Sequence, residues 1–173
     1  PTLVITPASV GPTTQYASFT ANFTSTGGTG LHTWSIVSGS LPTGLALTTT
    51  GTATSKISGT TTAAPGTYNF TIQSRDARGC TGALPVSLVV NCPTIVITPS
   101  SFSPVTQSVA YDQRLNAAGG TQPYTWTVVS GSLPSGLTLT ASDVAEGKIS
   151  GTTSAAPGDY PITVKASDAN GCF

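Results

Sequence analysis

The segment TWSIVSGSLPTGLALT at residues 33–48 is the most informative part of this sequence, because it returns as TWTVVSGSLPSGLTLT at residues 125–140. The offset is 92 positions (125 − 33), and two further pairs follow it: PTLVITPAS at 1–9 with PTIVITPSS at 93–101, and KISGTTTAAPGTY at 56–68 with KISGTTSAAPGDY at 148–160. The chain therefore contains two copies of one structural unit. We predict two domains, residues 1–92 and residues 93–173, with almost no linker between them.

The repeated unit has the composition and the periodicity of β-structure. Thr, Val and Ile favour strands, Gly and Pro mark turns, and no stretch shows a sustained apolar period of 3.6 residues. Alternation predicts the core faces of two strands in each copy: His32, Trp34 and Ile36 with Tyr124, Trp126 and Val128, and Tyr68, Phe70 and Ile72 with Tyr160, Ile162 and Val164. Tyr68 and Tyr160 each follow a Pro-Gly turn, which resembles a tyrosine corner.

We predict an all-β fold of two tandem immunoglobulin-like β-sandwiches, because the period of about 92 residues is close to the size of one such domain. The seven strands expected in the first copy span residues 2–6, 16–24, 31–38, 45–49, 53–58, 67–75 and 85–91. The second copy has no counterpart of residues 82–92, so its last strand is missing. We therefore expect a piece of a longer polypeptide. A groove that accepts a strand from another chain is an alternative reading of the missing strand.

Three short motifs occur in both copies: Gly-Gly-Thr, Ser-Leu-Pro-x-Gly-Leu and Ile-Ser-Gly-Thr. Together they resemble the immunoglobulin-like He-PIG repeats of bacterial surface and secreted proteins, which are similar to dystroglycan-type cadherin-like domains. The resemblance covers nearly the whole chain, twice. It implies β-sandwiches in tandem arrays on extracellular proteins, and it implies no single biochemical activity.

Composition argues against several classes of function. Charged residues make up 7% of the chain and the formal net charge is zero, so we expect no nucleic-acid partner, and no apolar run is long enough for membrane insertion. His32 is the only histidine, and neither a Gly-x-Ser-x-Gly nor a Cys-x-x-Cys motif occurs. We therefore predict no catalytic site, no cofactor and no zinc site, so the protein is not expected to be an enzyme.

Two ligand classes remain open. Cadherin-like relatives bind calcium, and the weak candidate ligands here are Asp76, Asp168 and Asn170; the same residues also fit plain turn chemistry. Arg78 stands where the second copy has Asn170, and a cation there would repel Ca²⁺. A glycan platform would need exposed aromatic side chains, whereas both tryptophans are expected in the core.

The three cysteines cannot all pair within the chain. Cys80 lies in the turn before the seventh strand and Cys92 at the far end of that strand, so an extended segment of about 23 Å separates them, too far for a disulfide. Strand alternation places the turn that holds Cys172 beside the start of the second domain. We predict a Cys92–Cys172 disulfide, with Cys80 unpaired or paired outside the chain, and therefore an oxidising, extracellular compartment.

These observations favour a non-enzymatic structural repeat of a secreted or cell-surface protein. The repeat would act as a rigid tandem spacer in an adhesin stalk or an extracellular filament. Its expected partners are neighbouring repeats of the same polypeptide or filament subunits. The alternative is a binding module for a carbohydrate or another ligand on a host surface.

Overall fold

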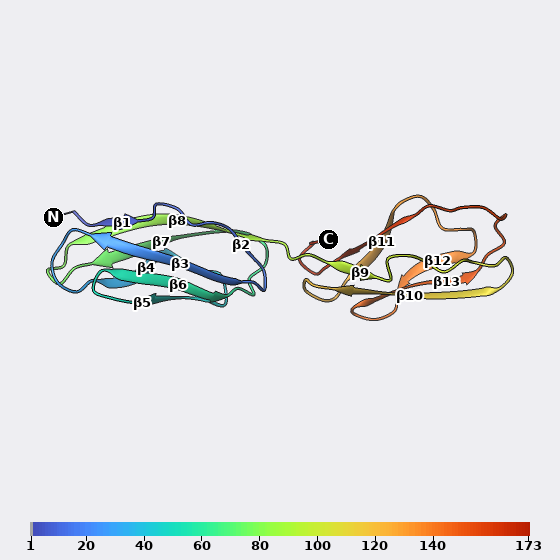
Figure 1. The fold of residues 1–173 in the computed structure, drawn as a ribbon, viewed down its shortest axis with the longest axis horizontal. Coiled ribbons are helices and arrows are strands. Elements are labelled where there is room, and N and C mark those ends of the chain that lie inside the picture. The colour runs from blue at the N-terminus through green and yellow to red at the C-terminus, as the bar shows by residue number, and fades with distance from the viewer. Residues whose placement is uncertain (1) are drawn as a thin grey trace. The chain divides into compact units, whose positions relative to one another are not determined.

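The computed structural model describes residues 2–173, and the chain divides into two compact units, Pro1–Cys92 and Pro93–Phe173 (Figure 1). Unit 1 contains eight strands: β1 (Val4–Thr6), β2 (Thr13–Thr14), β3 (Ser18–Thr26), β4 (Thr33–Gly39), β5 (Leu45–Thr49), β6 (Thr54–Thr60), β7 (Gly66–Arg75) and β8 (Thr81–Asn91). Unit 2 contains six: β9 (Val96–Thr98), β10 (Ala110–Ala118), β11 (Thr125–Ser130), β12 (Leu137–Ala141), β13 (Glu146–Thr152) and β14 (Thr163–Ser167). None of the described residues forms a helix that could span a bilayer.

Unit 1 is a sandwich of two four-stranded sheets, ordered β1-β3-β6-β5 and β2-β8-β7-β4. Every pairing is antiparallel except that β2 runs parallel to β8, with Thr13 opposite Val90. This strand order is that of an immunoglobulin-like sandwich. Alternate residues of both sheets point inward, and the fully buried side chains Phe23, Ile57, Ile72 and Leu88 form the centre of the core.

Unit 2 repeats the first sheet in full, in the order β9-β10-β13-β12, but its second sheet contains only β11 and β14. Its core gathers around Leu115, Trp126 and Ile149. Among the described residues, unit 2 has no counterpart of β2 or β8. The predicted class, two tandem immunoglobulin-like sandwiches with the last strand of the second missing, is confirmed.

In unit 1 most strand limits agree with the predicted ones to within two residues. There are two larger differences: β2 has no counterpart among the predicted strands and pairs with the sheet that β1 does not join, and β8 begins at Thr81 rather than at residue 85. The predicted tyrosine corner is confirmed in both units, since the Tyr68 hydroxyl donates to the Ala64 carbonyl (2.8 Å) and the Tyr160 hydroxyl to that of Ala156 (2.9 Å).

The predicted core position of Tyr160 is wrong. Its side chain is 41% exposed, and β14 begins only at Thr163, whereas the equivalent β7 begins at Gly66. In unit 1, Tyr68 lies opposite Leu88 of β8. Among residues 93–173, no strand pairs with the segment that contains Tyr160.

Candidate functional site

The polar side chain that organises unit 1 is Asp76, in the turn between β7 and β8. One carboxylate oxygen accepts the backbone N–H groups of Arg78 (3.0 Å) and Cys80 (2.8 Å), within its own turn. The other accepts the N–H of Thr29 (3.0 Å), from the Gly-Gly-Thr loop between β3 and β4. Asp76 is only 4% exposed. It therefore fastens two loops 47 positions apart in the sequence to each other.

Asp168 makes the same three hydrogen bonds in unit 2. It accepts the backbone N–H groups of Thr121 (2.9 Å), Asn170 (2.9 Å) and Cys172 (2.8 Å), and it is 5% exposed. A further backbone hydrogen bond closes each turn. The Asp76 N–H donates to the Cys80 carbonyl in unit 1, and the Asp168 N–H donates to the Cys172 carbonyl in unit 2. The repeated Gly-Gly-Thr and Asp-x-x-Gly-Cys segments thus form one loop pair at one end of each sandwich.

The electrostatics of Asp76 favour its ionised form. Desolvation raises the pKa of the carboxyl group, but the hydrogen bonds from Cys80, Thr29 and Arg78, together with the charge of nearby His32, outweigh it. The net pKa lies below the ordinary value of 3.8. The carboxylate is therefore an anchor that holds the loops while it is charged.

The other two repeated motifs meet at β5 and β6. Gly44 has a φ of +91°, and a Cβ atom there would collide with the carbonyl oxygen of Thr60. A Cβ atom on Gly59, across the sheet, would collide with the carbonyl oxygen of Gly44. Gly136 and Gly151 repeat this arrangement in unit 2. Both motifs are evident in the sequence, but their contact is not, and it brings two glycine backbones closer than any side chain allows.

A known protein family contains the repeated unit that carries these motifs. The model of the He-PIG family, described as "Putative Ig domain", matches residues 1–91 and again residues 93–172. The chain belongs to this family. The loop pair and the glycine contact are therefore features of two He-PIG domains in succession. A search of curated proteins finds no match to the chain.

Several solved structures resemble the He-PIG pair. The Z1Z2 domains of titin in complex with telethonin are 8% identical, with a TM-score of 0.49 over 95% of this chain and 93% of that chain. The EC3-6 structure of protocadherin gammaB7 is 16% identical, with a TM-score of 0.42 over 98% and 44%. The endo-fucoidan hydrolase MfFcnA4 from glycoside hydrolase family 107 is 23% identical, with a TM-score of 0.45 over 97% and 27%. The chain spans about a quarter of that hydrolase, and these similarities carry no conclusion about activity.

Of the candidate calcium ligands, Asp168 and Asn170 lie in one turn of unit 2, whereas Asp76 lies in the equivalent turn of unit 1. Asp76 and Asp168 each stand at the centre of their own turn, and the Asn170 amide donates to the Thr121 hydroxyl (2.9 Å). Among residues 2–173 no three His, Cys, Asp or Glu side chains lie close enough to hold a metal ion. Ca²⁺ takes six to eight oxygen ligands, several of them carboxylates, and the oxygens of these two carboxylates already accept backbone hydrogen bonds. The hydrogen bonds of Asp76 and Asp168 are those of turn chemistry.

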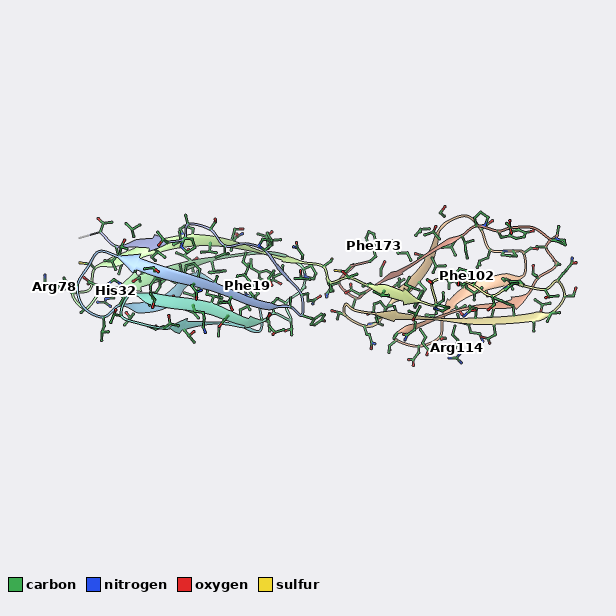
Figure 2. All side chains as sticks on the ribbon, viewed as in Figure 1. Phe19, His32, Arg78, Phe102, Arg114 and Phe173 are labelled. Carbon is green, nitrogen blue, oxygen red and sulfur yellow. The ribbon has the colours of Figure 1, made fainter. Side chains whose placement is uncertain are left out.

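A buried polar contact involves the single histidine. Nδ1 of His32 lies 3.2 Å from the Ser74 hydroxyl, and both residues are buried, as is Asp76. Figure 2 shows His32 at the same end of unit 1 as Arg78. A serine, a histidine and an aspartate resemble hydrolase chemistry, but Ser74 is 0% exposed, so no substrate could reach its hydroxyl. Unit 2 has Tyr124 and Ala166 at the positions of His32 and Ser74, which fits a packing role.

The two tryptophans do not form an exposed platform for sugars. Trp126 is 8% exposed and Trp34 is half-buried against the core of unit 1. Both indole N–H groups are buried without a hydrogen-bond acceptor. Trp126 lies directly over the backbone of Gly147, where a Cβ atom would overlap the indole ring. These rings are core residues of the He-PIG domains, as the alternation predicts.

The cysteines fall into two states. Cys92 and Cys172 are disulfide-bonded, whereas Cys80 carries a free thiol. Cys80 precedes β8 and Cys92 follows it, so the whole length of an eleven-residue strand lies between them. Cys172 is the last residue of the Asp168 turn in the loop pair of unit 2, and it is 1% exposed.

Proposed function

We propose that the chain is a non-enzymatic structural repeat that acts as a rigid tandem spacer in a secreted or cell-surface protein, such as an adhesin stalk or an extracellular filament. The observation that carries the proposal is the direct succession of two He-PIG domains, whose family matches are separated by Cys92 alone. The titratable groups that could suggest chemistry, Asp76 and Asp168, are occupied in holding loops.

A disulfide between Cys92 and Cys172 supports this role. It would join the residue before Pro93 to the last turn of unit 2, so that both ends of that domain are tied together. Closing a loop of 80 residues (172 − 92) stabilises a folded domain by about 4.5 kcal/mol in the chain-entropy model. Structural disulfides persist in oxidising compartments, which is why we place the protein outside the cell.

The surface suits a spacer that works in variable conditions. Charged residues are few, and ion pairs such as Arg114–Glu146 and Lys148–Asp112 lie partly in solvent, where each contributes little stability. Salt and pH therefore have few groups to act on. Neighbouring repeats of the same polypeptide, or subunits of the same filament, are the partners that such a chain requires.

Rigidity at the junction is the property to test. We would attach two dyes near the ends of the chain and measure the distribution of distances between them by single-molecule fluorescence. A narrow distribution is expected for the natural chain. A variant with a Gly/Ser linker inserted between Cys92 and Pro93 is the matched control, and its distribution should broaden. Equal widths for the two chains would refute the spacer role.

A further inference from the structure

A depression of about 320 Å³ lies on unit 1, over the sheet β2-β8-β7-β4 (Figure 1). Residues of three neighbouring strands line it. Its polar lining comes from Ser38 of β4, Asn69 and Thr71 of β7, and Ser87 of β8, and its apolar lining includes Pro85 of β8. Small-molecule sites in proteins begin at about 300 Å³, so the depression has room for one small organic molecule.

The strand register brings these five side chains together. Thr71 lies opposite Ser38 on one side and opposite Pro85 on the other, and Asn69 lies opposite Ser87. Residues directly opposite each other in an antiparallel sheet point to the same face, with Cβ atoms about 4.5–5.5 Å apart. The five residues therefore form one continuous group on one face of the sheet.

That face is the outer one. Phe70 and Val86 alternate with the lining side chains along β7 and β8, and they are 3% and 4% exposed because they point into the core. Asn69, Pro85 and Ser87 are exposed. A ligand can therefore reach the depression without any change in the fold.

Two irregularities of the strands meet at this place. The register of β4 shifts between Ile36 and Ser38, and such bulges re-aim side chains and are frequent beside functional sites. Gly39, which follows, has a φ of +69°, and a Cβ atom there would collide with the carbonyl oxygen of Asn69. Across the sheet, Pro85 has no backbone N–H to give to the ladder. Because Gly39 has no side chain, it leaves the space beside Asn69 unfilled.

The polar groups of the depression are available to a ligand. Among residues 2–173, the side chains of Ser38, Asn69, Thr71 and Ser87 have no hydrogen-bond partner. A hydroxyl group and a carboxamide can each donate and accept, and the ring of Pro85 adds an apolar surface. No charged residue lines the depression. This combination suits a neutral ligand that carries several hydroxyl groups and an apolar face.

We propose that the depression of unit 1 binds a neutral sugar residue. A pyranose ring has hydroxyl groups around its rim and C–H groups on its faces. Its hydroxyls bond to the Asn69 carboxamide and to the hydroxyls of Ser38 and Ser87, and one face of the ring packs on Pro85. An anion would find no cation here, and an extended peptide binds at a strand edge rather than on the face of a sheet. This role is additional to the spacer role and independent of it, because it needs unit 1 alone.

The probes are glucose, galactose, mannose, xylose and N-acetylglucosamine, each titrated into the intact, oxidised chain labelled with ¹⁵N. At least one sugar should shift the backbone amide signals of Ser38, Asn69, Thr71 and Ser87 in a saturable way, together with the side-chain amide signals of Asn69. The amide signals of unit 2 should not move. A capped, neutral tetrapeptide is titrated in parallel, to separate sugar binding from peptide binding.

Two pairs of variants show whether the depression is the binding site. Asn69→Ala should weaken binding roughly tenfold, because the ligand loses the hydrogen bonds of the carboxamide, whereas Gln73→Ala, on the same face of β7, should bind like the natural chain. Ser87→Phe places a ring in the depression and should abolish binding. Ala83→Phe, on the same face of β8 but outside the depression, should leave binding unchanged. The melting temperature of each variant shows whether it is folded.

Several results would overturn the proposal. These are the absence of saturable shifts with all five sugars, shifts that lie away from the depression, and equal affinities of the two variants in either pair. Binding of the tetrapeptide without binding of any sugar would also overturn it, by assigning the depression to a peptide ligand. None of these results bears on the rigidity of the junction, so the spacer role is tested separately.

Discussion

Asp76 holds two loops together only while its carboxyl group is ionised. Its pKa in the folded protein lies below the ordinary 3.8, so folding favours the charged form. The stability that it contributes is therefore fully present above the unfolded pKa and is lost as the pH falls through the folded pKa. Asp76 is therefore an acid-sensitive contact of unit 1.

The melting temperature of unit 1 should fall as the pH decreases from about 5 to about 2. Asp76→Asn removes the titrating group, so the variant should be less stable at neutral pH and should depend less on pH in this range. Differential scanning calorimetry of both chains across the pH series is the measurement. An acid dependence that is identical in the two chains would exclude Asp76 as its source.

Gly44 is the residue at which a single methyl group should have a large effect. Gly44→Ala places a side chain at a φ of +91° and against the carbonyl oxygen of Thr60, and it should destabilise unit 1 by about 1–3 kcal/mol. Gly11→Ala is the matched control, because nothing lies within 4 Å of a Cβ atom there. Denaturant titration compares the two, and a similar effect of both would contradict the contact.

Strand β8 contributes fully buried side chains to the core of unit 1. Leu88→Ala should destabilise unit 1 by about 2–5 kcal/mol, because it opens a cavity at a fully buried position. Val89→Ala, at the 40% exposed neighbour on the outer face, should change stability by less than about 0.5 kcal/mol. Calorimetry should show that neither variant shifts the unfolding of unit 2. A loss of stability in unit 2 would contradict the independence of its core.

The sequence predicts most of these strands, because alternation and turn residues act locally. Trp34 and Phe70 lie on the faces that their spacing indicates, and the internal repeat locates the missing strand. Partners far apart in the sequence were harder to foresee. The bond from Thr29 to Asp76 joins positions 47 apart, and turn chemistry alone does not name the partner. Tyr160 has the same sequence context as Tyr68, but Tyr68 lies opposite Leu88 of β8, whereas among the described residues no strand pairs with the segment around Tyr160.

Peptide mapping of the whole chain tests the proposed Cys92–Cys172 disulfide directly. Trypsin leaves Cys80 and Cys92 together in residues 79–114, so a second protease that cuts after Leu88 is needed. The expected product from the unreduced chain is a peptide containing Cys92 linked to one containing Cys172. A linked pair of Cys80 and Cys92 would show that the prediction is wrong.

The same disulfide would decide how the chain responds to force. When the two termini are pulled, the load should pass from Cys92 to Cys172 through the sulfur bridge and bypass residues 93–171. A single unfolding step of about 300 Å, from unit 1 alone, is expected in the oxidised chain at about 3.4 Å per residue. A second step of similar size should appear after reduction. Two steps before reduction would contradict the pairing.

The free thiol of Cys80 has a practical consequence. Because the other two cysteines are disulfide-bonded, a maleimide reagent should modify the oxidised chain at one position, in the Asp76-anchored turn. A surface, a bead or a gold particle can then be attached at a known end of unit 1 without any engineered residue. The chain already contains its own attachment point for assembling ordered layers.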